Sequence, residues 1–106
     1  MENSPRLQKL ERLLAVEPND PFCLYAMGQE FASLGQTESA IAWFDRAIAA
    51  DPDHAYARFH KARALESLGR LDEAKASLRE GLAAAERTRD GKARSELASA
   101  LDSLEP

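Results

Sequence analysis

Few residues in this chain have the types and spacing that chemistry requires, and the single cysteine is the first of them. Cys23 has no partner for an internal disulfide. It lies near the expected start of a helix, where the helix dipole could favour a reactive thiolate. Its neighbours Phe22 and Leu24 are apolar, and no histidine is close in sequence. The surroundings favour a buried structural cysteine.

The two histidines and the carboxylates beside them do not have the spacing of a metal site. His54 and His60 are six positions apart, on different faces of a helix or on a loop and a helix. No cysteine or further histidine follows at the spacing of zinc ligands. Asp51, Asp53 and His54 share the composition of a carboxylate–histidine set, but this pattern is typical of a capped turn. We expect neither a metal nor another cofactor.

The glycine-containing turns also lack the residues that bind phosphate. The segments at 35–39 and 69–73 read GQTES and GRLDE, without the lysine and second glycine of a phosphate-binding loop. The acidic residues are scattered over positions expected to face solvent. The sequence therefore offers no residues for catalysis, and we expect that the protein is not an enzyme.

Composition narrows the class of partner and the compartment. The chain has 106 residues, a formal net charge of −4 and a sequence pI near 5.2. This acidic balance argues against nucleic acid as the main partner, because phosphate binding needs a concentrated basic face. No run approaches the ~20 apolar residues of a membrane span, and the start has no apolar core of signal-peptide length. We expect a cytoplasmic protein without a membrane partner.

The spacing of apolar residues predicts an all-α protein. No segment alternates with a period of two, so we expect no strand. Asp20 and Pro21 are suited to begin one helix, Gly35 to end it, and Thr37 to cap the next. We expect residues 1–5 to be frayed and a single domain over 6–106. Its expected helices lie at 6–17, in pairs within 21–54 and 55–88, and at 90–104.

One segment of the sequence recurs after 34 residues. ASLGQTESAIAWF, from Ala32 to Phe44, returns in altered form as ESLGRLDEAKASL, from Glu66 to Leu78. Helix pairs that recur at this distance are typical of a helical solenoid. A single pair cannot cover its own apolar face, so pairs stack and terminal helices seal the ends.

The repeated residue types resemble those of tetratricopeptide repeat proteins, in particular a small stand-alone module of the bacterial type. The first repeat, 21–54, supplies Leu24, Met27, Gly28, Phe31, Ala40, Phe44, Ala47 and Pro52. The second, 55–88, supplies Ala62, Leu65, Ala74, Leu78 and Gly81. It departs from the pattern at Arg58, Lys61 and Glu86. The two basic residues indicate incomplete packing or a polar edge. The resemblance implies two full repeats between an N-terminal and a C-terminal capping helix.

Small residues are expected where the helices of a pair cross. Gly28 with Ala40, and Ala62 with Ala74, would let the backbones approach closely. Phe31 and Phe44 would then fill the space on either side. Trp43, on the second helix of its pair, faces away from the groove described next, and the sequence leaves open whether it is exposed or packed.

In this family the first helix of each pair lines a concave groove that receives an extended peptide or a partner helix. The resemblance carries groove positions onto both repeats and onto the last helix. They are Phe22, Tyr25, Gln29 and Ser33, then Tyr56, Phe59, His60 and Arg63, and finally Arg94. Some members clamp a terminal carboxylate with lysine and asparagine side chains. Here Tyr25, Gln29, His60 and Asp90 occupy those positions, so we do not expect that mode.

Two questions about the groove stay open at this level. The aromatic residues Phe22, Tyr25, Tyr56 and Phe59 form a binding patch if exposed, or part of the core if the N-terminal helix or the neighbouring repeat covers them. Arg63 and Arg94 bind acidic groups of a partner, or belong to a charged face whose stems lie on apolar neighbours.

The sequence thus predicts a non-enzymatic module that binds a protein or peptide ligand in its groove. Only two full repeats are present, so we expect modest affinity. The alternative is a structural scaffold, a weak homodimer or larger homo-oligomer that uses the same aromatic face or a terminal helix.

Overall fold

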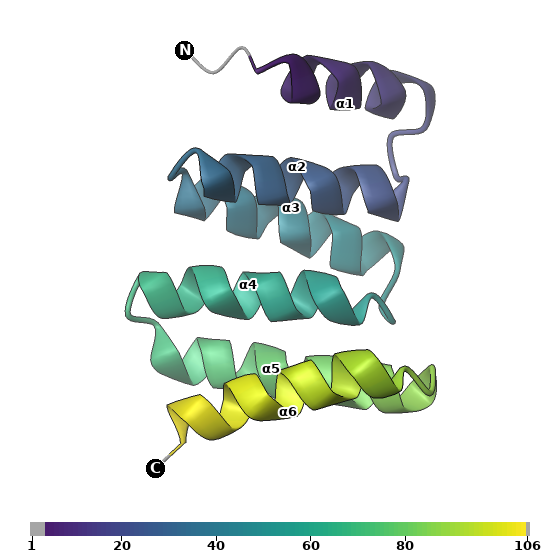
Figure 1. The fold of residues 1–106 in the computed structure, drawn as a ribbon. Helices are drawn as coiled ribbons and strands as arrows, with labels where there is room; N and C mark the ends of the chain where they lie inside the picture. The colour runs from purple at the N-terminus through teal and green to yellow at the C-terminus, as the bar shows by residue number, and fades with distance from the viewer. Residues whose placement is uncertain (1–3, 106) are drawn as a thin grey trace.

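A computed structural model describes residues 4–105, which form helices and turns without a strand (Figure 1). The helices are α1 (Pro5–Val16), α2 (Pro21–Ser33), α3 (Thr37–Ala50), α4 (Ala55–Ser67), α5 (Leu71–Arg87) and α6 (Gly91–Leu104). The expected all-α solenoid of helix pairs is confirmed.

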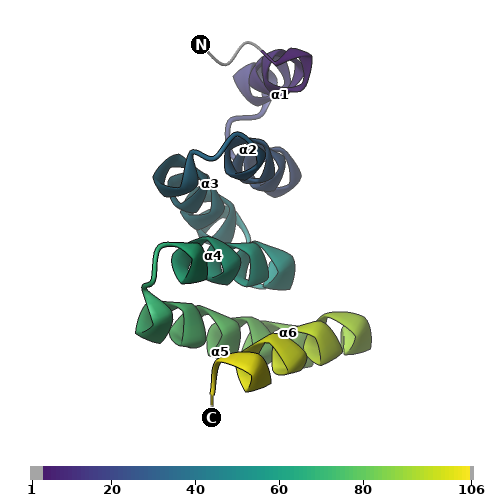
Figure 2. The same cartoon turned by 60° about the vertical axis from the view of Figure 1, so that its left-hand side comes forward.

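The helices stack in chain order, with the two ends of the chain at opposite ends of the stack (Figures 1 and 2). Helices α2 and α3 form one antiparallel pair, and α4 and α5 form the next, while α1 and α6 lie at the two ends. The first helices of successive pairs also touch, α2 with α4 and α4 with α6. One face of the molecule is therefore built from α2, α4 and α6.

Local signals place the first two helix starts. The Ser4 hydroxyl accepts a hydrogen bond from the Leu7 N–H at 2.9 Å, and Pro5 is the first helical residue. The expectation that 1–5 is frayed is thus wrong at Ser4 and Pro5, while residues 1–3 lie outside the described residues. Asp20 caps α2 through the Phe22 N–H at 3.0 Å, as expected.

The turn between α2 and α3 is tighter than expected. Gly35 takes the left-handed conformation, with φ +78°, and the Gln36 N–H bonds back to the Phe31 carbonyl at 3.0 Å. Thr37 is already the first helical residue, so it is not the cap we expected. The same turn returns after α4, where Gly69 has φ +76° and the Arg70 N–H bonds to the Leu65 carbonyl.

Gly28 is required by an aromatic ring. A Cβ atom on this residue would overlap the ring of Phe44, which is 1% exposed. The ring thus fills the space in which Ala40 was expected to meet the glycine. Trp43 is half-buried between α1, α2 and α3, and its ring stacks on Phe31 with centroids 6.3 Å apart.

The departures from the family pattern in α4 form a polar edge. Arg58 pairs with Glu80 at 3.1 Å, and Lys61 pairs with Asp45 at 2.7 Å. The hydroxyl of the buried Ser77 donates to the Arg58 carbonyl at 2.8 Å. Polar contacts therefore join α4 to α3 and to α5.

Substitution of Gly28 tests the close contact with Phe44. Gly28→Ala should lower the free energy of unfolding by about 1–3 kcal/mol, because the added methyl group meets a ring that cannot move into solvent. Urea unfolding followed by Trp43 fluorescence measures the change.

Gly91→Ala is the matched control, because a Cβ atom there meets open space. Gly91→Ala should be neutral or stabilising by up to about 1 kcal/mol, because it adds helix propensity without a steric contact. Alanine favours helix over glycine by about 1 kcal/mol, so a stabilising Gly28→Ala substitution would contradict the contact.

Candidate peptide-binding groove

The face built from α2, α4 and α6 contains two clefts. The smaller, of about 200 Å³, lies between the α2–α3 pair and α4, and it is lined by Ala32, Thr37, Phe44, His60, Arg63, Ala64 and Ser67. The larger, of about 680 Å³, lies between α4 and α6, and it is lined by Phe59, Arg63, Glu66, Ser95, Glu96, Ser99, Ala100 and Ser103. Arg63 belongs to both clefts, so they adjoin along α4.

Rings from neighbouring repeats pack together beside these clefts. The centroid of His60 lies 5.6 Å from that of Tyr25 and 5.1 Å from that of Phe59. Tyr25 also lies 6.0 Å from Phe44. Burial raises the pKa of Tyr25 to about 12, with smaller contributions from Tyr56 and Glu96. Contacts between these rings join the two repeats.

The four groove aromatics are neither all exposed, as a binding patch would require, nor all buried in the core. Tyr25, Tyr56 and Phe59 are half-buried, because the neighbouring helices cover part of each ring. Phe22 is 75% exposed and lies at the start of α2, 6.1 Å from the His54 ring. It faces a separate depression at the α1–α2 turn, which it shares with Val16.

Two polar groove positions are already engaged locally. The Gln29 side-chain amide donates to the Tyr25 hydroxyl at 3.2 Å. The Ser33 hydroxyl donates to the Glu30 carbonyl at 2.7 Å. Gln29 therefore orients Tyr25, whereas Ser33 closes the end of its own helix.

Sequence reasoning placed Arg94 in the groove and missed Glu96. Arg94 pairs with Glu86 of α5 at 3.5 Å and lines neither cleft. Helices α2 and α4 begin 34 residues apart, whereas α4 and α6 begin 36 apart. Because of the two extra residues, the position of α6 that is equivalent to His60 of α4 is occupied by Glu96 and not by Arg94. The greater length of α5, 17 residues against 14 in α3, is the signal that could have revealed this shift.

Glu96 reaches across the groove to Tyr56. Burial raises the pKa of Tyr56, and the charge of Glu96 and its hydrogen bond with the phenol raise it further. A carboxylate from α6 therefore lies near a ring from α4. The larger cleft thus has a negatively charged wall on its α6 side.

His54 forms a helix cap, as the sequence favoured. Its Nδ1 atom accepts a hydrogen bond from the Ala57 N–H at 3.2 Å. Among residues 4–105, no cluster of histidine, cysteine and carboxylate side chains could hold a metal ion. The Cys23 thiol donates to Asp20 at 3.5 Å, and burial together with that carboxylate raises its pKa. These surroundings favour the thiol over a reactive thiolate.

A family model described as tetratricopeptide repeat matches residues 31–101, two thirds of the chain. The chain belongs to the tetratricopeptide repeat family. Both the family and the fold support a role in protein–protein interaction. No helix within residues 4–105 has the length and apolar character to cross a membrane.

This tetratricopeptide protein is similar to other chains of known sequence or structure. The crystal structure of a tetratricopeptide repeat domain protein from Salinibacter ruber is 31% identical, with a TM-score of 0.76, over 81% of this chain and 96% of that one. Superkiller protein 3 of Saccharomyces cerevisiae is 34% identical over 68 residues, which are 64% of this chain but only 5% of that protein.

PcrH, solved in complex with the chaperone binding region of PopD, shares the fold. Its TM-score is 0.83, over 90% of this chain and 72% of PcrH, at 21% identity.

The two histidines should make stability depend on pH. Burial lowers the pKa of both histidines below the usual 6.5. At His60 the charges of Arg63 and His54 lower the pKa further, whereas Glu96 raises it. At His54 the charge of Asp51 partly offsets the effect of burial. Below about pH 6.5 the unfolded chain therefore binds more protons than the fold. The free energy of unfolding should fall as the pH drops from 7.5 through 6.5 toward the lowered values.

A double variant, His54→Asn with His60→Gln, provides the comparison. Asparagine keeps a good helix cap but does not titrate, so the decline between pH 7.5 and 5.5 should be shallower than in the natural protein. Chemical unfolding at each pH measures both. Parallel declines would show that other groups cause the pH dependence.

Proposed function

We propose that the α2–α4–α6 face binds a segment of another protein, either an extended peptide or a helix. The observation that carries this proposal is the pair of adjoining clefts, which together run across all three helices of that face. Half-buried aromatic rings beside small side chains are typical of surfaces that take up side chains of a partner.

The mechanism is burial of a few partner side chains against this face. Tyr25 and Phe59 provide apolar area, and the small Ala32, Ala64 and Ala100 leave room for an occupant. Gln29 holds the Tyr25 ring in place, and Arg63 orients the polar groups of the partner. Because the groove spans only three helices, we expect micromolar affinity, ~−8 kcal/mol.

The complex of PcrH supports this proposal. That protein has the same fold and was solved with the chaperone binding region of another protein. The fold is thus compatible with recognition of a polypeptide segment.

Selection of peptides provides a direct test. A randomised 12-residue peptide library displayed on phage is selected against the natural protein, and the best peptide is titrated against variants. Phe59→Ala should weaken its binding at least tenfold, because the ring forms a wall of the larger cleft.

Leu71→Ala is the matched control. Leu71 is a large apolar residue, 45% exposed, that begins α5 and lines neither cleft. Its peptide affinity should change less than twofold. Circular dichroism verifies that both variants fold. Equal binding by Phe59→Ala and the natural protein would contradict recognition in the groove.

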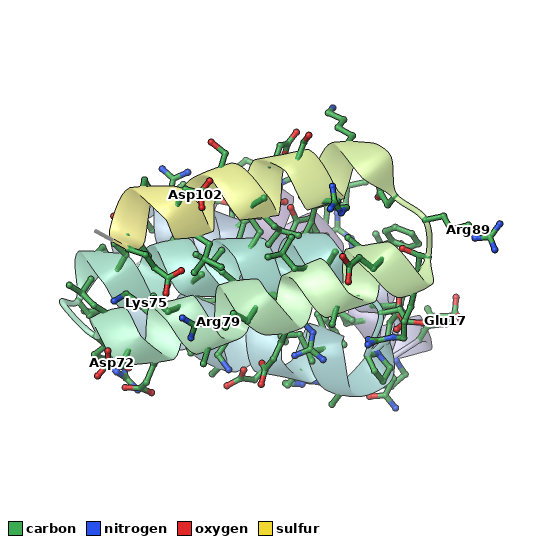
Figure 3. The ribbon with its side chains drawn as sticks, turned by 90° about the horizontal axis from the view of Figure 1, so that it is seen from below. Glu17, Asp72, Lys75, Arg79, Arg89 and Asp102 are labelled. Atoms are coloured by element: carbon green, nitrogen blue, oxygen red, sulfur yellow. The ribbon has the colours of Figure 1, made fainter. Side chains whose placement is uncertain are left out.

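A second candidate function, self-association, is favoured by the exposed apolar residues of α1. Val16 is 80% exposed and Leu13 is 46% exposed. At the opposite end Leu71 is 45% exposed, but charged side chains accompany it: the labelled Asp72, Lys75 and Arg79 come from α5, and Asp102 comes from α6 (Figure 3). Self-association would therefore use α1, as in the scaffold alternative.

Sedimentation velocity over a range of concentrations tests this candidate. If α1 mediates a homodimer, the mass of the natural protein should rise with concentration, and Leu13→Gln with Val16→Gln should keep it monomeric. Phe59→Ala should leave the dimer intact. A constant monomer mass would exclude the scaffold function.

A further inference from the structure

Arg63 has a special place in the groove. It lies in the middle of α4 and is the single residue that lines both clefts. Its guanidinium carbon lies 5.8 Å from the centroid of the Phe59 ring. An arginine held over an aromatic face keeps the edge of its planar group, with the N–H donors, free for a ligand.

The charge of Arg63 has no partner within residues 4–105, where its side chain forms neither an ion pair nor a hydrogen bond. Other arginines are engaged: Arg58 binds Glu80 at 3.1 Å, Arg70 binds Glu73 at 2.8 Å, and Arg87 binds Asp53 at 2.8 Å. Arg94, the other basic residue expected in the groove, is paired with Glu86. Arg63 is therefore the cation that the groove offers to a ligand.

The carboxylates near Arg63 belong to the larger cleft. Glu96 lies close enough to Tyr56 to raise the pKa of its phenol, and Glu66 lies about one turn farther along α4 than Arg63. Neither lines the smaller cleft, where Arg63 is the only charged residue if His60 is neutral. Burial and the charge of Arg63 lower the pKa of His60, which favours its neutral form. The smaller cleft thus combines one positive charge with the apolar Ala32, Phe44 and Ala64 and the hydroxyl side chains of Thr37 and Ser67.

The size of the smaller cleft limits its occupant. Its volume of about 200 Å³ is below the ~300 Å³ at which pockets for small molecules begin. It suits a single side chain of a polypeptide. The two alanines and the Phe44 ring leave room for a small apolar side chain, and the cation at the rim favours a carboxylate beside it.

We infer that the partner segment carries an acidic residue next to an apolar residue, with the apolar side chain in the smaller cleft and the carboxylate bound by Arg63. This inference rests on the proposed function and specifies the class of ligand. A planar guanidinium binds a carboxylate through two parallel N–H···O bonds. Glu66 and Glu96 repel further acidic residues, so they confine the preferred carboxylate to the side of α4 that faces α2.

Charge reversal tests the inference. The same displayed library is selected against the natural protein and against Arg63→Glu. Peptides from the natural protein should be enriched in an Asp or Glu adjacent to an apolar residue. The best peptide should bind Arg63→Glu at least tenfold more weakly, and a version with Lys in place of its acidic residue should recover affinity for that variant.

Arg89→Glu is the matched control, because this arginine projects outward from the α5–α6 turn and lines neither cleft (Figure 3). It makes the same change in net charge and should leave peptide affinity within twofold. Arg63→Lys should retain the preference for acidic peptides with lower affinity, because the charge stays but the paired donors are lost.

The outcomes separate this inference from the proposed function. Selected peptides that lose affinity with Phe59→Ala, but show no acidic preference and bind Arg63→Glu equally well, would overturn the inference and leave groove binding intact. Enrichment of basic residues would also overturn it and would assign recognition to Glu66 and Glu96. If no peptide is enriched, the proposed function fails and the inference fails with it.

Discussion

The close contact between the backbone of Gly28 and the ring of Phe44 links the packing of the first helix pair to the shape of the groove. The absent side chain lets the ring enter the space between α2 and α3, where it is almost fully buried. The same ring lines the smaller cleft and lies 6.2 Å from His60 of the next repeat. A change in this contact would therefore alter both the pair and the surface proposed to bind a partner.

Stacking of successive repeats creates the groove. The smaller cleft is lined by the α2–α3 pair and α4, and the larger cleft is lined by α4 and the terminal helix α6. The rings of Tyr25 and His60 meet across the boundary between the two repeats, while Arg58 and Lys61 form ion pairs at the polar edge of α4. Within the tetratricopeptide architecture, this chain thus combines aromatic groove residues with Arg63, a groove arginine that forms no ion pair within residues 4–105. The helix stack is common to the family, whereas the groove side chains are particular to this sequence. We propose that together they recognise a segment of another protein.

The elements that depend on local chemistry could be predicted closely. Asp20 and Pro21 begin α2, and Gly35 and Gly69 end helices in the left-handed conformation, because caps and glycine turns are decided within a few residues. Thr37 failed as a cap because the Gln36 N–H bonds back to Phe31, so the helix begins one residue sooner than a capping side chain would require. At the start of the chain, Ser4 likewise supplied a cap where fraying was expected.

The sequence by itself determined the all-α class, the 34-residue repeat and the family, since apolar spacing and small residues at fixed positions reflect the helix period and the packing of a pair. Only the tertiary structure decided which groove residues are accessible. Neighbours that are distant in sequence decide these properties. They leave Phe22 exposed and cover part of Phe59. They also pair Arg94 with Glu86 and leave Arg63 without an ion pair within residues 4–105. The two-residue shift before α6, which brought Glu96 to the groove, changed the angular position of every side chain on that helix, because each residue turns an α-helix by about 100°.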